Sequence, residues 1–298
     1  MQAITCAQIK RYAAEHGFSA AYCFPPEAED RAPEGIQTLV LLTLEYAPGG
    51  RLTDRFYPAS NAAYHEAKRM AERISDETGV KAERLSELKM KPMCRRHPAF
   101  GTGKNTLNYL PGIGSRFCLE LIGLCAPVES EECAAYDGSS LDCGTCDRCE
   151  RVCPGGAISS EGFTKERCIR YYMMSGKVMP EELRSHVGLR KGAYGIIGCD
   201  LCQRVCPANA KKEAQRTEND DFSLAQLLEC DRETLARFAA LYGKNYAVKN
   251  RIIAQALLTA ANNGCAEFLE RIGSLEDNPS ALVAEYARWA RKKLEEKG

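Results

Sequence analysis

The first third of the chain alternates segments with helical spacing of apolar residues and segments with strand spacing. A helix is predicted behind Thr5, a typical N-cap residue, with Ile9, Tyr12 and Ala13 on one face and Gly17 as its stop. Three short apolar runs have the length and composition of strands: residues 18–24, 38–44 and 116–124.

A second helical pattern begins at Ser60 or Asn61, where small and aliphatic residues recur at helical intervals up to Ile74. A polar, basic connection then runs to Pro98, before the third strand. Helices and strands that alternate in this way predict an α/β domain over residues 1–128.

The pattern changes after residue 128. Residues 129–215 are rich in cysteine and are predicted to form a ferredoxin-like α+β domain, which a polar linker at 213–221 follows. Residues 216–298 are predicted to be all-helical, with Ser223 and Asp231 as N-caps. Short Ala- and Leu-rich helices joined by Gly and Asn-Pro turns resemble HEAT-type pairs, and a plain helical bundle fits the same periodicity.

Composition narrows the classes of function. The 298 residues suffice for two or three domains with a real core, and 40 Lys and Arg balance 40 Asp and Glu. Because the formal net charge is zero, no overall basic field argues for nucleic acid or for a membrane surface. No apolar run approaches the length of a membrane span, and the start of the chain does not resemble a signal peptide. Sixteen cysteines in such a chain indicate a reducing, cytoplasmic compartment and metal binding.

The spacing of the cysteines is the strongest signal. One run has the C-x2-C-x2-C-x3-C-P spacing of bacterial ferredoxins: Cys143, Cys146, Cys149 and Cys153. In that pattern three close cysteines bind one cluster and the fourth crosses to a second cluster. A second run at 199–207 repeats the pattern without its first cysteine, and Ile196 stands in that place.

A 4Fe–4S cluster needs four thiolates, so the second run needs a cysteine from elsewhere. Cys168, between the two runs, is the best candidate, and Cys133 is its main rival. The sequence therefore predicts two 4Fe–4S clusters with crossed ligand sets: Cys143, Cys146, Cys149 and Cys206 for one, and Cys153, Cys168, Cys199 and Cys202 for the other. Zinc and disulfides are the alternatives, but this spacing is not a usual zinc layout. The other eight cysteines are most simply small buried residues.

Three further features have both a functional and a structural interpretation. The glycine turn at 101–106 is neither a P-loop nor a dinucleotide fingerprint, and it is either an anion-binding loop or a plain turn. Among the four histidines, His65 and His97 have the most suggestive neighbours, and no His motif for cobalamin ligation occurs. A basic helix start is either a solvated surface or a contact for phosphates and bases: Lys244, Lys249 and Arg251, with Tyr242 and Tyr246 nearby.

Several separated stretches resemble the epoxyqueuosine reductases, the cobalamin and iron–sulfur enzymes of queuosine tRNA modification. The resemblance is carried by G-x-G-K-N-T-L at 101–107, G-S-x-F at 114–117, R-C-I at 167–169 and Y-G-I-I-G-C-D-L-C-Q-R-V-C-P at 194–207. K-N-R at 249–251 and E-Y-A-R-W-A at 285–290 are similar to that family's HEAT-type ending.

The resemblance implies that electrons pass through both clusters to a base-off cobalamin, which reduces the substrate, in the family the epoxide of a modified nucleoside in tRNA. It implies a set of cofactor-binding residues: Tyr64, His65, Gly103, Lys104, Asn105, Thr106, Gly114 and Ser115. The expected partners are an electron donor of the reduced flavodoxin or ferredoxin type and tRNA, with no membrane. We further expect a monomer.

One family residue has no counterpart. Aligning the family's V-D-x-x-P-x-x-E-R motif on Pro92 places Lys89 at the aspartate that donates a proton, Arg95 at the glutamate and Arg96 at the arginine. Opening an epoxide needs a proton, so Arg96 and His97 are the candidate catalytic residues, with an Asp or Glu from elsewhere as another source. Three alternatives stay open: a corrinoid-dependent reductase of another substrate, a ferredoxin-like electron-transfer protein, and a tRNA-binding protein that keeps its clusters for structure.

Overall fold

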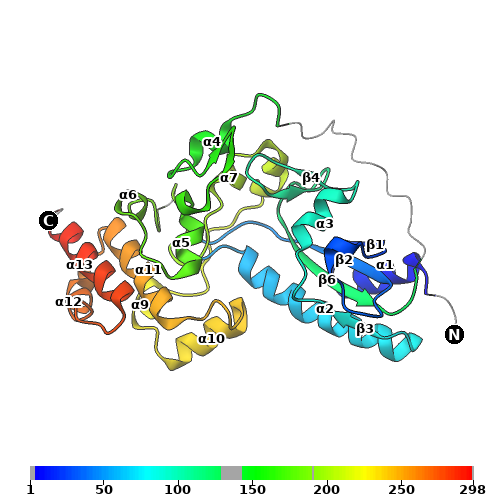
Figure 1. The fold of residues 1–298 in the computed structure, drawn as a ribbon. Coiled ribbons are helices and arrows are strands. Elements are labelled where there is room, and N and C mark those ends of the chain that lie inside the picture. Colours follow the sequence, from blue (N-terminus) through cyan, green and yellow to red (C-terminus); the bar gives the residue numbers. More distant parts are fainter. Residues whose placement is uncertain (1–3, 129–142, 190, 297–298) are drawn as a thin grey trace. The chain divides into compact units, whose positions relative to one another are not determined.

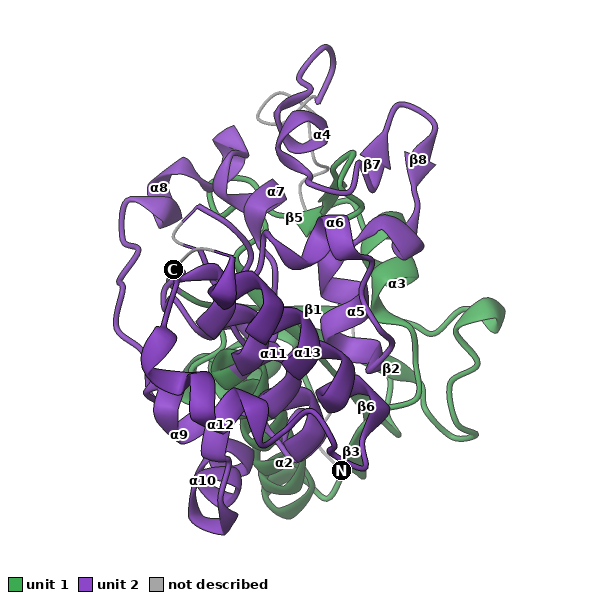
Figure 2. Ribbon diagram, turned by 90° about the vertical axis from the view of Figure 1, so that its left-hand side faces the viewer, with its two compact units in different colours: residues 1–46, 58–142 green, residues 47–57, 143–298 purple. Residues whose placement is uncertain are grey.

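The chain forms two compact units (Figures 1 and 2). The computed structural model describes residues 4–128, 143–189 and 191–296. Unit 1 comprises residues 1–46 and 58–142, and unit 2 comprises residues 47–57 and 143–298. The short segment 47–57 therefore belongs to the same unit as the C-terminal part of the chain, although the residues on both sides of it belong to unit 1.

Unit 1 is built on a four-stranded antiparallel sheet in the order β1-β2-β6-β3. Its elements follow the chain in this order: α1 (Cys6–Glu15), β1 (Ala20–Phe24), η1 (Ala28–Asp30), β2 (Thr38–Glu45), α2 (Phe56–Thr78), β3 (Ala82–Arg84), α3 (Met90–Arg96), β4 (Gly101–Thr102), β5 (Asn108–Tyr109) and β6 (Phe117–Leu124). The predicted first helix and all three predicted strands are confirmed, and Thr5 caps α1 through a capping box with Gln8.

The two faces of this sheet carry different helices (Figure 1). Alternate strand residues, such as Leu41 and Leu121, pack with Met93 of α3 in one hydrophobic core. Residues of the opposite parity point to the side of α2, where Glu120 of β6 pairs with Arg84 of β3. The side chains on the two faces therefore belong to separate environments.

Two predictions for this unit need correction. Helix α2 begins at Phe56, not at Ser60 or Asn61, because Asp54 accepts a hydrogen bond from the backbone of Phe56 (3.0 Å) and starts the helix earlier. Pro58 is tolerated there, since the first-turn N–H groups of a helix have no partner within the helix. The polar connection before Pro98 contains β3 and α3, whose few apolar residues were too sparse to show a period.

Unit 2 contains the cysteine-rich segment and the C-terminal helices, which share one hydrophobic core (Figure 2). Its elements are α4 (Arg148–Val152), β7 (Ile158–Ser159), β8 (Gly162–Phe163), η2 (Lys165–Arg167), α5 (Ile169–Ser175), α6 (Glu181–Arg184), α7 (Leu201–Arg204), η3 (Pro207–Asn209), α8 (Ala210–Glu213), α9 (Leu224–Glu229), α10 (Arg232–Tyr242), α11 (Lys249–Asn262), η4 (Ala266–Phe268), α12 (Leu269–Gly273) and α13 (Ala281–Glu295). Ser223 and Asp231 cap α9 and α10 as predicted. The predicted segments 129–215 and 216–298 thus meet in one unit.

Helix α11 is buried almost all round, and its polar side chains bind the backbone of the cysteine-rich segment. Gln255 accepts a hydrogen bond from the Ile197 amide (2.7 Å) and donates one to the Met173 carbonyl (3.0 Å). Asn262 donates to the carbonyls of Arg184 (2.8 Å) and Val187 (2.6 Å). Buried backbone groups need such partners, so α11 fixes the course of the chain before the second cysteine run.

The predicted linker at 213–221 is bound to the segment 47–57. The Asp220 carboxylate accepts hydrogen bonds from the amides of Arg51 and Leu52, each at 2.7 Å. Arg55 pairs with Asp221 at 2.8 Å. These contacts explain why residues 47–57 belong to unit 2.

We predict that Gln255→Leu destabilises unit 2 by about 2–5 kcal/mol, because it leaves two buried backbone groups unpaired, each worth about 1–3 kcal/mol. The measurement is denaturant unfolding followed by helical circular dichroism under anaerobic conditions. Gln215→Leu, at an exposed glutamine of the same unit, is the matched control and should stay within about 0.5 kcal/mol of the parent. Equal midpoints for the two variants would contradict the bridging role of Gln255.

Candidate functional site

Four thiols of the first predicted ligand set are neighbours in the structure. Burial raises the pKa of the Cys206 thiol, and the nearby thiols of Cys143 and Cys146 raise it further. Burial likewise raises the pKa of Cys149, where Cys143 and Cys206 add to the effect. The last cysteine of the second run thus lies with three cysteines of the first run.

The other four thiols form a second group. Burial raises the pKa of Cys202 to about 12, and among the thiols Cys168 contributes most, with Cys153 also acting on it. Cys153 raises the pKa of Cys168, and both Cys202 and Cys168 raise that of Cys199 after burial. Cys149 of the first group also acts on Cys202, so the two groups are adjacent. Cys168 thus lies near the other thiols of the second predicted set, and its rival Cys133 lies outside the described residues.

Short helices and prolines set the directions of these thiols. Cys149 lies within α4, and Cys153 directly follows it, where its sulfur accepts a hydrogen bond from the Ala157 amide (3.2 Å). Cys206 precedes Pro207, which opens η3 at a position where a missing N–H costs nothing. Each cysteine after a short helix therefore turns away from its own run and toward the other.

Asp200, between Cys199 and Cys202, is fully buried and holds this loop in place. Its carboxylate accepts hydrogen bonds from Arg204 (2.5 Å), Arg216 (2.6 Å) and the Tyr194 hydroxyl (3.0 Å). Two guanidinium partners compensate for burying the charge, which would otherwise be very costly. Sequence reasoning missed this network, because Arg216 lies outside the cysteine motif.

The thiol groups do not form a site for a single metal ion in the part of the chain that the structure describes. Within the described ranges, no three His, Cys, Asp or Glu side chains converge as ligands of one metal ion. Zinc needs its thiolates gathered around one atom, whereas the thiolates of a 4Fe–4S cluster bind separate iron atoms and lie farther apart. Of the remaining cysteines that the structure describes, five are buried (Cys6, Cys23, Cys94, Cys118 and Cys230) and two are partly buried (Cys125 and Cys265).

The glycine turn at 101–106 joins the two strands of the β4–β5 hairpin. Gly101 is required because a Cβ there would lie 2.2 Å from the Tyr109 ring. Asn105 accepts a hydrogen bond from the Leu107 amide (3.2 Å), and Thr106 adopts a positive φ of 61°. The loop does not open a helix, so the anion site expected of a helix N-terminus is not formed there.

The implied cofactor-binding residues divide between the two faces of the unit 1 sheet. The turn of Gly114 (φ 76°) closes on Leu110 through backbone hydrogen bonds of 2.9 and 3.0 Å, and this turn and the hairpin belong to the α3 side. Tyr64 and His65 lie on α2, where the Arg84 guanidinium stacks 4.2 Å from the Tyr64 ring centre. The structure therefore does not bring Tyr64 and His65 together with the hairpin.

The two candidate catalytic residues have different surroundings. Arg96 forms ion pairs with three carboxylates of the η1 region: Glu27 (3.1 Å), Glu29 (3.0 Å) and Asp30. His97 lies among the rings of Tyr22, Phe24 and Phe100, at centroid distances of 5.0, 5.6 and 5.9 Å. Burial lowers the pKa of His97 below its ordinary value of 6.5, so its imidazole is neutral at neutral pH. Lys89 is exposed just before α3.

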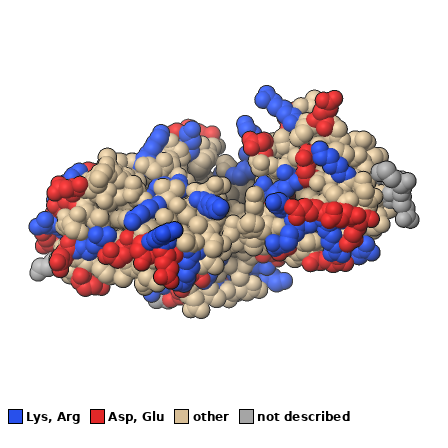
Figure 3. Space-filling view, turned by 90° about the horizontal axis from the view of Figure 1, so that it is seen from below, with Lys and Arg blue, Asp and Glu red and all other residues tan. Residues whose placement is uncertain are grey.

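The basic cluster near α11 is mostly used for structure. Tyr242 is fully buried, with its hydroxyl bonded to Thr53 and Asp221, so its ring cannot stack on a base. Arg251 donates to the carbonyls of Met174 and Asn245. Figure 3 shows Lys and Arg interspersed with Asp and Glu on the face in view. No helix in the described part of the chain is long and apolar enough to cross a membrane.

Residues 142–209 match the family described as the 4Fe-4S double cluster binding domain. The chain is 32% identical over 250 residues to an epoxyqueuosine reductase of Xanthomonas campestris, an alignment that covers 76% of this chain and 66% of that protein. It is 28% identical over 236 residues to the epoxyqueuosine reductase of Leadbetterella byssophila, covering 74% of each. The chain spans 55% of the length of the epoxyqueuosine reductase of Lactococcus garvieae.

Solved structures share the fold over nearly the whole chain. The epoxyqueuosine reductase from Streptococcus thermophilus superimposes with a TM-score of 0.74 at 18% identity, covering 98% of this chain and 90% of that one. The enzyme from Bacillus subtilis gives a TM-score of 0.73 at 19% identity, covering 97% and 90%. With the matched cluster domain and the sequence relatives, these similarities show that the chain belongs to the epoxyqueuosine reductase family.

Proposed function

We propose that this protein is an iron–sulfur oxidoreductase that passes electrons through two 4Fe–4S clusters to a corrinoid cofactor. The observation that carries the proposal is the crossing of the two cysteine runs into two groups of four thiols. Cys143, Cys146, Cys149 and Cys206 hold one cluster, and Cys153, Cys168, Cys199 and Cys202 hold the other. Adjacent clusters suit the transfer of electrons from one to the next.

The residues on the α3 side of unit 1 suit the polar rim of a corrinoid, which carries amides and a phosphate. Lys104, Asn105, Thr106 and Ser115 lie on two half-buried turns and offer an ammonium, an amide and two hydroxyls. When bound, a base-off corrinoid supplies low-valent cobalt as the reductant of the substrate. Tyr64 and His65, on the other face, receive no geometric support for this role.

The substrate proposed first is that of the relatives' name, epoxyqueuosine. A solved structure of epoxyqueuosine reductase with an epoxyqueuosine-modified tRNA stem loop, which shares the fold, supports tRNA as the partner. The helices of residues 216–298 are proposed as the HEAT-like part. We also propose a cytoplasmic monomer. The open alternatives are a corrinoid-dependent reductase of another substrate and an electron-transfer protein without a substrate.

Proton supply distinguishes this chain from the family pattern. His97 is the candidate general acid, because Lys89 replaces the family's aspartate and Arg96 is engaged by three carboxylates. The aromatic rings around His97 fix its plane. Its Nδ1 accepts a hydrogen bond from the Ala99 amide (3.3 Å) in the neutral form, so the imidazolium that donates a proton forms only when this bond is given up.

Cys168→Ala should lower the iron content from about eight to about four atoms per chain, because it removes one ligand of the second cluster. The measurement is iron and sulfide analysis after anaerobic reconstitution. Cys265→Ala, at a partly buried cysteine of the same unit outside both groups, is the control and should keep about eight. Eight irons in the Cys168 variant would move the ligand to another cysteine, such as Cys133.

Titration of the reconstituted protein with cobalamin should produce the absorption spectrum of the base-off form. Lys104→Ala should weaken binding roughly tenfold, since a hydrogen bond to a charged group is worth about 1.5–3 kcal/mol. Lys81→Ala, at an exposed lysine of the same unit, should bind like the parent. If the parent protein gives no base-off spectrum, the electron-transfer alternative replaces the reductase.

Reduction of epoxyqueuosine in a tRNA stem loop should become faster as the pH falls toward and below 6.5. The pKa of His97 is lowered by burial, so the fraction of imidazolium able to donate a proton rises only in acid. His97→Phe should remove this pH dependence, and His186→Phe should retain it. No turnover in the parent protein with bound corrinoid would point to another substrate, and an unchanged pH profile in His97→Phe to another proton donor.

A further inference from the structure

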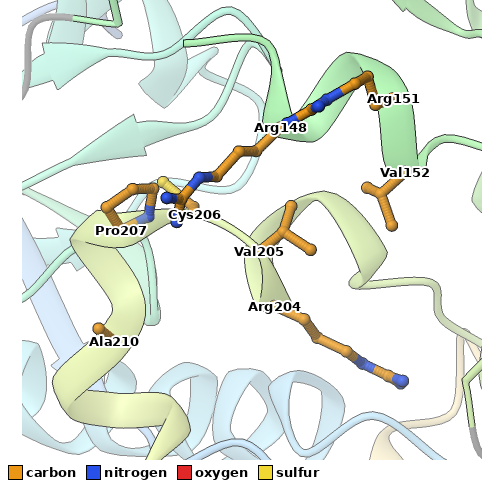
Figure 4. A pocket seen from close by; sticks show the side chains of 8 residues that line it. All are labelled: Arg148, Arg151, Val152, Arg204, Val205, Cys206, Pro207 and Ala210. Carbon is orange, nitrogen blue, oxygen red and sulfur yellow. The ribbon is translucent and has the colours of Figure 1, made fainter.

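A basic cavity of about 640 Å³ lies in unit 2 beside the first cysteine group (Figure 4). It is formed where α4, α7 and η3 meet, and Figure 4 shows Arg148 extending from α4 toward Cys206 and Pro207. The described residues that line it include no acidic side chain: Arg148, Arg151, Val152, Arg204, Val205, Cys206, Pro207 and Ala210. One wall of a solvent-accessible basic cavity therefore carries a proposed cluster ligand.

The three arginines differ in how firmly they are held. Arg204 is fixed by its 2.5 Å hydrogen bond to the buried Asp200 and lies 5.1 Å from the centre of the Tyr194 ring. Arg151 pairs with Asp147 at 3.2 Å, but the side chains are 71% and 52% exposed, so this pair is weak. Arg148 is exposed and forms no ion pair with a carboxylate in the described part of the chain. Two arginines are thus available to an incoming anionic surface.

The first cysteine group lies closer to solvent than the second. Gly144, Thr145 and Arg148, which neighbour the first group in sequence, are exposed. Cys199 instead lies in the stretch 192–201, whose remaining residues are all buried. An electron that arrives from outside therefore has its shortest route through the first cluster, since transfer slows steeply with distance.

From this arrangement we propose that the arginine cavity over α4 and α7 is the docking site of a small acidic electron-donor protein. The proposal rests on the two clusters of the proposed function. Acidic side chains around the donor's cofactor would pair with Arg148 and Arg151, while Val152 and Val205 supply the apolar contact typical of the core of an interface. One electron leaves the reduced donor and enters the first cluster, and no bond is formed or broken.

A phosphate backbone is the competing occupant of a basic cavity. Among the described residues that line the cavity, no aromatic side chain offers a surface on which a base could stack. Cys206, a proposed cluster ligand, lies in its wall and Arg148 extends toward it, a position that electron transfer requires and RNA binding does not. The mixture of arginine and valine side chains also favours a protein surface.

The test compares two rates of cluster reduction in the reconstituted full-length protein, one with fully reduced bacterial flavodoxin and one with dithionite. The double variant Arg148→Glu/Arg151→Glu should lower the ratio of the flavodoxin rate to the dithionite rate at least tenfold, because steering by charge accelerates association by about 10- to 1,000-fold. The flavodoxin rate of the parent should fall as salt is added. Arg232→Glu, at an exposed arginine of the same unit, should keep the parent ratio.

An unchanged ratio in the double variant overturns the docking site. If the ratio is unchanged while binding of a tRNA stem loop weakens, the cavity is a phosphate-binding surface instead. A parent protein without dithionite-reducible clusters sinks the proposed function itself, before the docking question arises. Equal iron contents in all variants exclude loss of folding as the cause of a lower ratio.

Discussion

The position of the second cysteine run depends on polar groups buried beneath it. Gln255 of α11 pairs with the backbone at both ends of the segment from Met173 to Ile197, and Asp200 then fixes the next turn. In an apolar interior each unpaired group would cost about 1–3 kcal/mol, so these bonds specify one path for the chain. The helical C-terminal part therefore supports the cysteine-rich segment.

The proposed grouping of the cysteines follows from counting thiolates. Each cluster needs four and the second run has three, so the sequence predicts one further cysteine. The thiol of Cys168 lies near those of Cys153, Cys199 and Cys202, and its role as a ligand stays a prediction. Long apolar runs such as β2 were equally clear, because a buried strand leaves a continuous pattern. The strands follow from local patterns in the sequence, and the predicted ligand sets follow from the number of thiolates that a cluster needs.

The missed features depend on contacts between distant parts of the chain. Nothing near Arg51 or Asp220 indicates that segment 47–57 pairs with 213–221 across about 170 positions, and the polar composition of both segments suggested loops. Tyr242 looked available for base stacking, although its hydroxyl bonds to Thr53 and Asp221. The sequence also does not show which elements lie on which face of the unit 1 sheet. It therefore could not tell that Tyr64 and the β4–β5 hairpin lie on different faces.

The distribution of charge explains how a chain with no net charge can still present a local basic surface. In three groups a buried or half-buried charge meets opposite charge within one unit: Arg84 with Glu120, Arg96 with three carboxylates, and Asp200 with Arg204 and Arg216. Opposite charges in contact largely cancel at a distance, so such contacts reduce the long-range field of the side chains involved. Arg148 and Arg151, which remain exposed next to a proposed cluster ligand, therefore create a local positive potential that the net charge of zero does not reveal. Residues beside the first thiol group are exposed and those around Cys199 are buried, and under the proposed function this difference in depth directs electrons from the surface to the interior.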